Sequence, residues 1–145
     1  MDFYGKIFHN ECMGLQDYLA FIQKTLEIES VKKVSEDSYI LEHVERTFKL
    51  YQQGKQVFLE GSIGPSLKDT PETNAMLAEL LQFNLKRTRF LDNIIFLDND
   101  THQLFLRELL PIEEIPTEEL KAYLEDFVLN IEVIEDRFFP KATAD

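Results

Sequence analysis

Residues 76–85 read MLAELLQFNL, and this stretch decides how the rest of the chain is interpreted. Wound as a helix at about 100° per residue, it forms one apolar face. That face consists of Leu77, Leu80, Leu81 and Leu85. Met76 and Phe83 lie beside the face and widen it to roughly half of the helix circumference. Asn84 falls near its middle, so the helix is apolar on more than one side and also carries an amide in the apolar stripe.

The size and composition of the chain indicate one ordinary globular domain. Its 145 residues suit a single domain, and 44% of them are hydrophobic while 29% are charged. Cys12 is the one cysteine, so no internal disulfide can form and a reducing cytoplasm is the expected compartment. The start MDFYGKIFHNEC lacks the pattern of a signal peptide, and no apolar run approaches the roughly 20 residues that span a bilayer. We therefore expect no membrane partner.

The charge distribution excludes one class of partner. Asp and Glu number 27 against 15 Lys and Arg, a formal net charge of −12. Residues 111–145 hold ten of the acids and three of the bases. Such a surface repels phosphate backbones, so we expect no direct binding of nucleic acid. A basic protein partner, or the solubility of a chain with exposed apolar patches, explains the charge better.

Hydrophobic periodicity and turn signals predict the order of elements across a single domain of residues 1–145. The expected helices cover residues 15–28, 71–87 and the region from Thr117 onward, and the expected strands cover residues 38–44, 46–52, 55–63, 94–98 and 103–109. Thr70-Pro71-Glu72 is a good helix start, with a hydroxyl cap, a first-turn proline and an acid at the positive end of the dipole. The order predicts an α+β fold with a mainly antiparallel sheet. Residues 1–13 give no clear signal.

The residues that carry chemistry do not form a recognisable site. His9, Glu11 and Cys12 are close in sequence but lack the spacing of a zinc site. Asp98, Asn99 and Asp100 begin like a calcium loop but lack its later glycine and glutamate. We therefore predict no catalytic residue, no metal site and no cofactor, and we do not expect an enzyme.

Apolar side chains exceed what one core needs. Phe21 and Ile28 lie off the apolar stripe of the first helix. Phe105 and Leu109 share one strand face with Arg107, so we expect that face to be partly open. These four apolar residues are the candidate binding surface for another protein.

Three stretches together resemble the family of type III secretion chaperones, the small acidic dimers that escort effectors and include the Tir chaperones. The stretches are VFLEGSIGP (57–65), LAELLQFNL (77–85) and FLDNDTHQLFLRELLPIEEIPTEELKAYLEDFV (96–128). The second resembles the family's Leu-Leu-x-x-Asn helix, with Leu80, Leu81 and Asn84 in the matching places. The resemblance covers roughly residues 14–136, and residues 1–13 precede the usual start of the first helix.

The resemblance implies a homodimer that binds the extended N-terminal segment of a secreted effector in the bacterial cytoplasm. The second helix and a neighbouring strand would form the dimer contact. Its expected residues are Met76, Leu80, Phe83 and Arg87. Leu77, Leu81 and Leu85 would then face the protomer's own core. Asn84 would tie a nearby loop through its amide, because a buried amide without partners is costly.

A second function class stays open on the sequence alone. The acids of the last helix would suit a decoy that occupies the basic face of a DNA-binding regulator. Decoy binding would collapse as the salt concentration rises, whereas binding in an apolar groove would change much less. An enzyme of unknown type ranks third.

Overall fold

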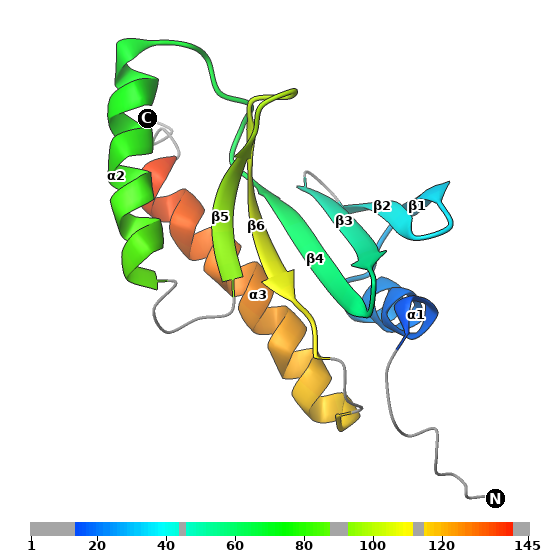
Figure 1. Cartoon of the computed structure of the whole chain (residues 1–145). Coiled ribbons are helices and arrows are strands. Elements are labelled where there is room, and N and C mark those ends of the chain that lie inside the picture. Colours follow the sequence, from blue (N-terminus) through cyan, green and yellow to red (C-terminus); the bar gives the residue numbers. More distant parts are fainter. Residues whose placement is uncertain (1–13, 44–45, 88–92, 112–114, 141–145) are drawn as a thin grey trace, which may run out of the picture.

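The computed structural model describes residues 14–43, 46–87, 93–111 and 115–140, without the side chains of residues 85–87. Within these residues, three helices and six strands follow one another along the chain (Figure 1). In chain order they are α1 (Leu15–Thr25), β1 (Ser30–Ser35), β2 (Ser38–His43), β3 (Arg46–Gln53), β4 (Gln56–Ile63), α2 (Pro71–Arg87), β5 (Asn93–Asp98), β6 (Gln103–Leu109) and α3 (Thr117–Phe138). The α+β class is confirmed, and α2 has the predicted bounds.

β1 corrects the predicted order, because the structure has four strands before α2 where we expected three. It pairs antiparallel with β2, and Val31 lies opposite Leu41. All six residues of β1 are exposed, so the strand has no buried face that a periodic pattern could reveal. α1 also ends earlier than predicted, at Thr25, and Glu27 then adopts a left-handed conformation with φ of 53° before β1 begins.

The six strands form one antiparallel sheet in the order β1-β2-β3-β4-β6-β5. The predicted tight turn between β3 and β4 is present, and Gly54 occupies it with φ of 61°, a conformation that glycine adopts without strain. β1 and β5 are therefore the two outer strands. What covers each of these edges decides where another chain could add to the sheet.

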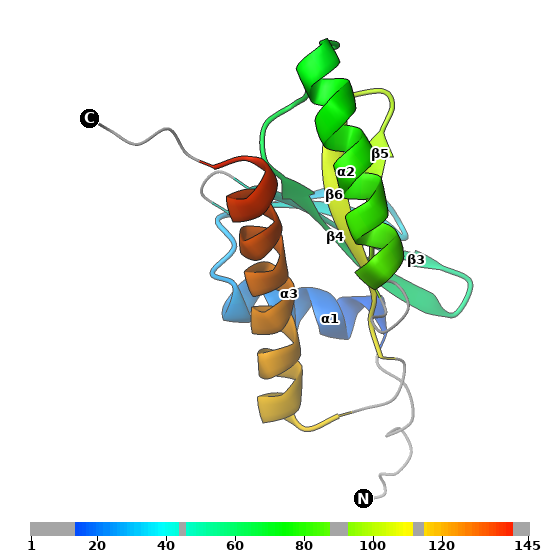
Figure 2. The same ribbon diagram turned by 90° about the vertical axis from the view of Figure 1, so that its left-hand side faces the viewer.

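α1 and α3 cover one face of the sheet, with α3 against β4 and α1 against β3. Figures 1 and 2 together place α2 beside β5 instead, at the edge of the sheet. The core lies between the sheet and the two covering helices, and α3 contributes the buried side chains Leu120, Leu124, Phe127, Ile131 and Ile134. The opposite face of the sheet is turned toward the viewer in Figure 1, and no described helix crosses it there.

Candidate functional site

Asn84 joins α2 to the outer edge of the sheet. Its side-chain nitrogen donates to the carbonyl oxygen of Ile95 at 3.0 Å, and the backbone N–H of Ile95 donates to the Asn84 side-chain oxygen at 2.9 Å. The amide thus satisfies the two backbone groups that a further strand would have paired. We predicted that Asn84 would tie a loop, but its partner is strand β5. At this point the β5 edge is closed by the chain's own helix.

The same contact fixes the rotation of α2 and reverses our assignment of its leucines. Leu80, one turn before Asn84, is 4% exposed and belongs to the protomer's core. Leu81, which we expected to face that core, is 60% exposed. Leu77 is half-buried and packs against the core, while the side chain of Leu85 lies outside the described residues. The sequence pattern alone does not show which of the four leucines face the core, whereas the contact of Asn84 with β5 does.

The other predicted dimer residues do not form a free surface. Phe83 is half-buried and meets Phe138 of α3 edge to face, with ring centroids 5.5 Å apart. The guanidinium of Arg137 lies over the Phe83 ring at 4.9 Å. Met76 is half-buried and packs against the core. The side chain of Arg87 lies outside the described part of the chain. A dimer contact through these residues stays a prediction that the single chain does not test.

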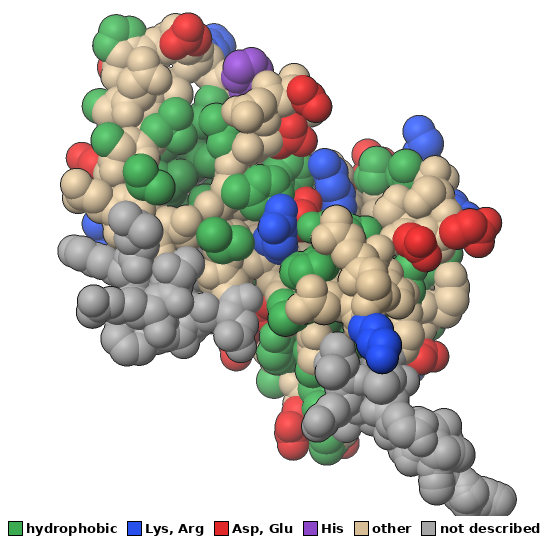
Figure 3. Space-filling view, viewed as in Figure 1, with side chains coloured by type: hydrophobic (Ala, Val, Ile, Leu, Met, Phe, Trp, Pro, Cys, Tyr) green, Lys and Arg blue, Asp and Glu red, His purple; other side chains and the backbone are tan. Residues whose placement is uncertain are grey.

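Exposed apolar side chains do occur on α2 and β5. Leu81 of α2 and Ile94 of β5 are both exposed, and the two elements lie side by side. Figure 3 shows hydrophobic side chains gathered over this part of the molecule, at the upper left. This α2–β5 surface is the described region that best suits contact with a second copy of the chain.

β1 forms the other edge of the sheet and is open. It pairs with β2 on one side, and within the described residues no strand pairs with its other side. Its side chains include two exposed valines, Val31 and Val34, and two lysines, Lys32 and Lys33. Lysines on an edge strand commonly discourage uncontrolled pairing, while backbone groups there can still accept an extended peptide.

The four predicted effector-binding residues lie deeper than expected. Phe21 and Ile28 are half-buried and pack against the core, so our prediction that Phe21 touches no core residue was wrong. Phe105 is buried on the open face of the sheet, where it stacks on Phe96 at 5.7 Å between ring centroids. Leu109 is half-buried. None of the four is strongly exposed, and a binding role for them stays a prediction.

A charged and aromatic network surrounds Phe105 on the open sheet face. Glu60 is buried there, accepts a hydrogen bond from the Tyr51 hydroxyl and pairs with Arg107, whose Nε lies 3.1 Å from its carboxylate. The Arg107 guanidinium covers the Phe96 ring at 4.6 Å. Burial, followed by the Glu60 contact, raises the pKa of Tyr51 well above its usual range. These side chains satisfy one another, which explains how a sheet face without a covering helix holds a buried carboxylate.

Metal and membrane sites receive no support from the described residues. No group of three His, Cys, Asp or Glu side chains among them could hold a metal ion. His9, Glu11 and Cys12, which we had considered together, lie outside the described part of the chain. Among the helices described, none combines the length and the apolar character needed to cross a membrane.

Comparisons with known proteins agree with this architecture. The chain is similar to a chain of the ExsC–ExsE complex, with a TM-score of 0.63 and 17% sequence identity, over 89% of this chain and 98% of that one. It is also similar to a chain of the HopA1–SchA chaperone–effector complex, with a TM-score of 0.50 and 16% identity, over 80% and 91%. At such identities the likeness concerns the fold. No curated protein sequence matches the chain.

The family comparison goes further than the fold. The model of the Tir chaperone protein (CesT) family matches residues 18–134, which include every strand, α2 and most of α1 and α3. The match contains both the Asn84 contact and the open β1 edge. Because it extends over most of the 145 residues, the chain belongs to the Tir chaperone protein (CesT) family.

Proposed function

We propose that this type III secretion effector chaperone holds its client as an extended segment along the open β1 edge. The observation that carries the proposal is the difference between the two outer strands. β5 is blocked at Ile95 by the Asn84 amide, whereas none of the described strands pairs with the outer side of β1. An added strand would gain backbone hydrogen bonds for affinity, and the valines of β1 would supply apolar contacts for selectivity.

The partner in this proposal is the N-terminal segment of a secreted effector. SchA and HopA1 form a chaperone–effector complex, and ExsC was solved in complex with ExsE. By analogy, the client of this chain would be an effector protein. The open β1 edge would hold its segment in an extended form. Binding would withdraw that segment from aggregation by mass action, without a chemical reaction or a cofactor. We expect this to happen in the bacterial cytoplasm and the protein not to be an enzyme.

The alternative of an acidic decoy for a DNA-binding regulator is not favoured. Membership of a chaperone family supports effector binding instead.

The experiment uses the effector that co-purifies with the chain from its host, identified by mass spectrometry. Its N-terminal segment is titrated calorimetrically into the wild type and into the double variant Val31→Lys/Val34→Lys. Added charge on an edge strand opposes strand addition, so we expect affinity to fall about tenfold, or about 1.4 kcal/mol. Ala20→Lys/Ala122→Lys is the matched control, because it adds the same two charges at exposed positions of α1 and α3 that lie on neither β1 nor the lining of a neighbouring hollow.

Two results would contradict the proposal. If no secreted protein co-purifies with the chain or binds it, the effector-chaperone function is wrong here. If a client binds the β1 variant as tightly as the wild type, the protein is a chaperone but the client does not use this edge.

We further propose that the chain forms a homodimer through the α2–β5 surface defined above. Leu81 and Ile94 support this proposal, since exposed large apolar side chains on adjacent elements are a common mark of an interface.

A further inference from the structure

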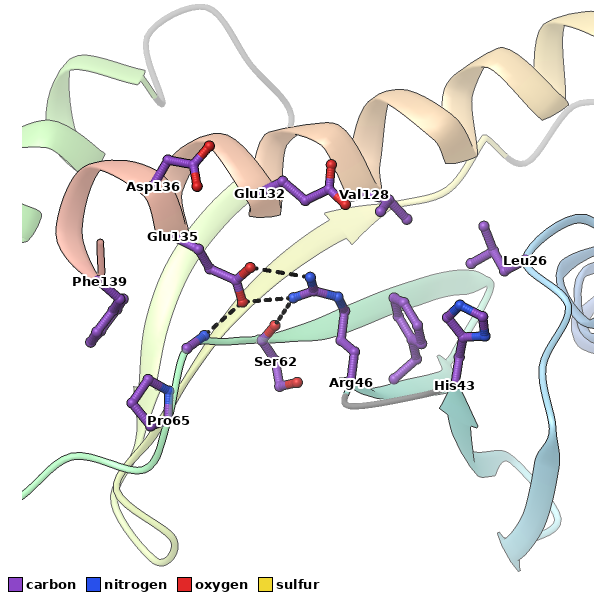
Figure 4. Close-up of a pocket in the computed structure, with 12 residues that line it drawn as sticks. Leu26, His43, Arg46, Ser62, Pro65, Val128, Glu132, Glu135, Asp136 and Phe139 are labelled. Carbon is purple, nitrogen blue, oxygen red and sulfur yellow. Dashed lines mark hydrogen bonds and ion pairs between the residues drawn. The ribbon is translucent and has the colours of Figure 1, made fainter. Parts of the chain in front are cut away.

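A hollow of about 820 Å³ opens between the second half of α3 and the ends of β2, β3 and β4 (Figure 4). Its volume lies within the range of pockets that hold ligands. Phe48 lines it and is fully buried, while Leu26, Val128 and Phe139 also line it and are half-buried. The hollow therefore offers apolar surface that the chain's own described side chains do not fully cover.

Arg46, which lines the hollow, is already neutralised. Two nitrogens of Arg46 bind the two carboxylate oxygens of Glu135 at 2.8 and 3.1 Å, and the same guanidinium donates to the carbonyl oxygen of Ser62 at 2.8 Å. The backbone N–H of Gly64 also donates to Glu135, at 2.8 Å. Such a two-pronged pair is rigid and specific. Arg46 is thus not free to receive an anionic ligand.

Two other carboxylates of the hollow have no such partner. Glu132 and Asp136 lie one turn apart on α3, and both are exposed. Neither forms an ion pair with any described residue. Figure 4 shows both on the α3 side, with His43 and Leu26 across the hollow. The hollow thus combines an incompletely covered apolar wall with two negative charges that no described residue pairs with, and together these features suit a cationic and apolar ligand.

The hollow also adjoins the β1 edge. Ser30, the first residue of β1, pairs with Glu42, and the next residue, His43, lines the hollow. Leu26, which follows the last residue of α1, lines it as well. A client segment that pairs with β1 could therefore continue from the end of that strand into the adjoining hollow.

We propose that this hollow selects client segments in which a lysine or arginine lies next to an aliphatic or aromatic residue. The cation binds Glu132 and Asp136, and the apolar side chain packs against Val128 and Phe139. The inference rests on the proposed chaperone function and adds to it a chemical rule for the client. It also gives the acids of α3 a specific role, because an apolar groove alone would not distinguish a basic segment from an acidic one.

The test maps peptide binding on the full chain by NMR, with isotopically labelled protein and three capped tetrapeptides. Leu-Lys-Val-Arg combines both features, Leu-Glu-Val-Glu reverses the charge, and Gly-Lys-Gly-Arg keeps the charge without the apolar side chains. We expect Leu-Lys-Val-Arg to shift the amides of Val128, Glu132 and Asp136, and each of the other two peptides to bind at least about fivefold more weakly. The affinity of the chain for Leu-Lys-Val-Arg should fall as salt is added.

Charge-removing variants of similar shape test the two carboxylates. Glu132→Gln/Asp136→Asn should weaken Leu-Lys-Val-Arg binding by about five- to tenfold. Glu125→Gln/Asp126→Asn removes the same charge from exposed positions of α3 that do not line the hollow, and it should bind like the wild type. Equal binding of all three peptides, shifts confined to other residues, or full affinity of the first variant would each overturn the proposal.

Two further outcomes separate this proposal from the others. Shifts of the same amides with protein concentration, in the absence of peptide, would assign the hollow to a second copy of the chain and overturn the client assignment. If the natural client binds Glu132→Gln/Asp136→Asn as tightly as the wild type, the hollow does not select clients, but the chaperone function and the β1 edge stand.

Discussion

At the scale of single residues, the two hydrogen bonds of Asn84 to Ile95 replace a missing strand. Asn84→Leu keeps most of the volume but leaves both backbone groups of Ile95 without a partner. An unsatisfied buried group costs about 1–3 kcal/mol, so we expect the free energy of unfolding to fall by about 2–4 kcal/mol. Urea denaturation measures it, with Asn74→Leu on an exposed position of α2 as the control. A loss no larger than that of the control would show that Asn84 does not hold α2 in place.

Tyr18 presents the opposite situation, a buried hydroxyl without a hydrogen-bond partner among the described residues. Tyr18→Phe should therefore be neutral or slightly stabilising near pH 7. Tyr123→Phe should cost about 1 kcal/mol, because the Tyr123 hydroxyl donates to the Leu109 carbonyl oxygen at 3.0 Å. Thermal melts of the two variants give the comparison. Equal destabilisation would mean that the Tyr18 hydroxyl has a partner, such as a water molecule.

The raised pKa of Tyr18 predicts that alkaline pH lowers the stability of the protein. Burial, with a smaller contribution from Asp17, raises the pKa of Tyr18 from 10.0 to about 12. Above pH 10.0 the unfolded chain loses the Tyr18 hydroxyl proton before the folded chain does. Titration of Tyr18 therefore leaves the free energy of unfolding unchanged below pH 10.0 and lowers it as the pH rises toward about 12. The wild type should lose more stability than Tyr18→Phe between these values. Parallel slopes in urea denaturation across this range would contradict the shift.

At the scale of elements, the contact between β4 and α3 depends on Gly61. A β-carbon at this position would lie 2.6 Å from the Ile131 side chain and 3.2 Å from Phe127. Gly61→Ala should therefore separate strand and helix and cost about 1–3 kcal/mol. Ile131→Val removes the atom that clashes first, so the double variant should be more stable than the sum of the two single changes predicts. Additive effects in a double-mutant cycle of denaturation curves would exclude this contact as the cause.

Some helices and strands could be predicted from a local sequence pattern, and others could not. The start of α2 was predictable because the Thr70 hydroxyl, which accepts from the Thr73 N–H at 3.1 Å, is a local signal. β1 was not predictable in the same way, since SVKKVS is exposed throughout and is a strand only through its pairing with β2. Its lysines were the available signal, because edge strands often carry them. Local signals are readable in one sequence, whereas pairing across the sheet is not.

At the scale of the whole molecule, the predicted class, the order of the later elements and the family were all confirmed. The assignment of apolar residues to core or interface was not predictable to the same degree. Leu80 and Leu81 are chemically identical neighbours, and the rotation of α2, which the Asn84 contact helps to fix, places one inside and the other outside. The hollow was missed for a related reason, because Arg46 and Glu135 are 89 positions apart in the chain.

Because Leu81 and not Leu80 is exposed, Leu81 is the residue to change in a test of the dimer. We expect the wild type to be a dimer at micromolar concentration and Leu81→Glu to be a folded monomer. Leu81 is 60% exposed in the protomer, so a charge there costs little until a second copy would bury it, which disfavours association by several kcal/mol. Phe83→Glu, by contrast, should destabilise the protomer itself, since Phe83 packs on Phe138 and Arg137.

Light scattering after size-exclusion chromatography measures the mass of each variant, and circular dichroism checks that it is folded. Leu129→Glu is the control, because this leucine is 55% exposed but belongs to α3 and not to α2 or β5, and its variant should remain a dimer. A monomeric wild type would end the dimer proposal. A dimeric Leu81→Glu variant would move the interface away from α2 while leaving the dimer itself intact. Leu80 and Leu81 are adjacent, so the folding of Leu81→Glu also tests the rotation of α2. A folded variant means that Leu81 points outward, as the Asn84 contact requires, whereas an unfolded variant means that Leu81 faces the core.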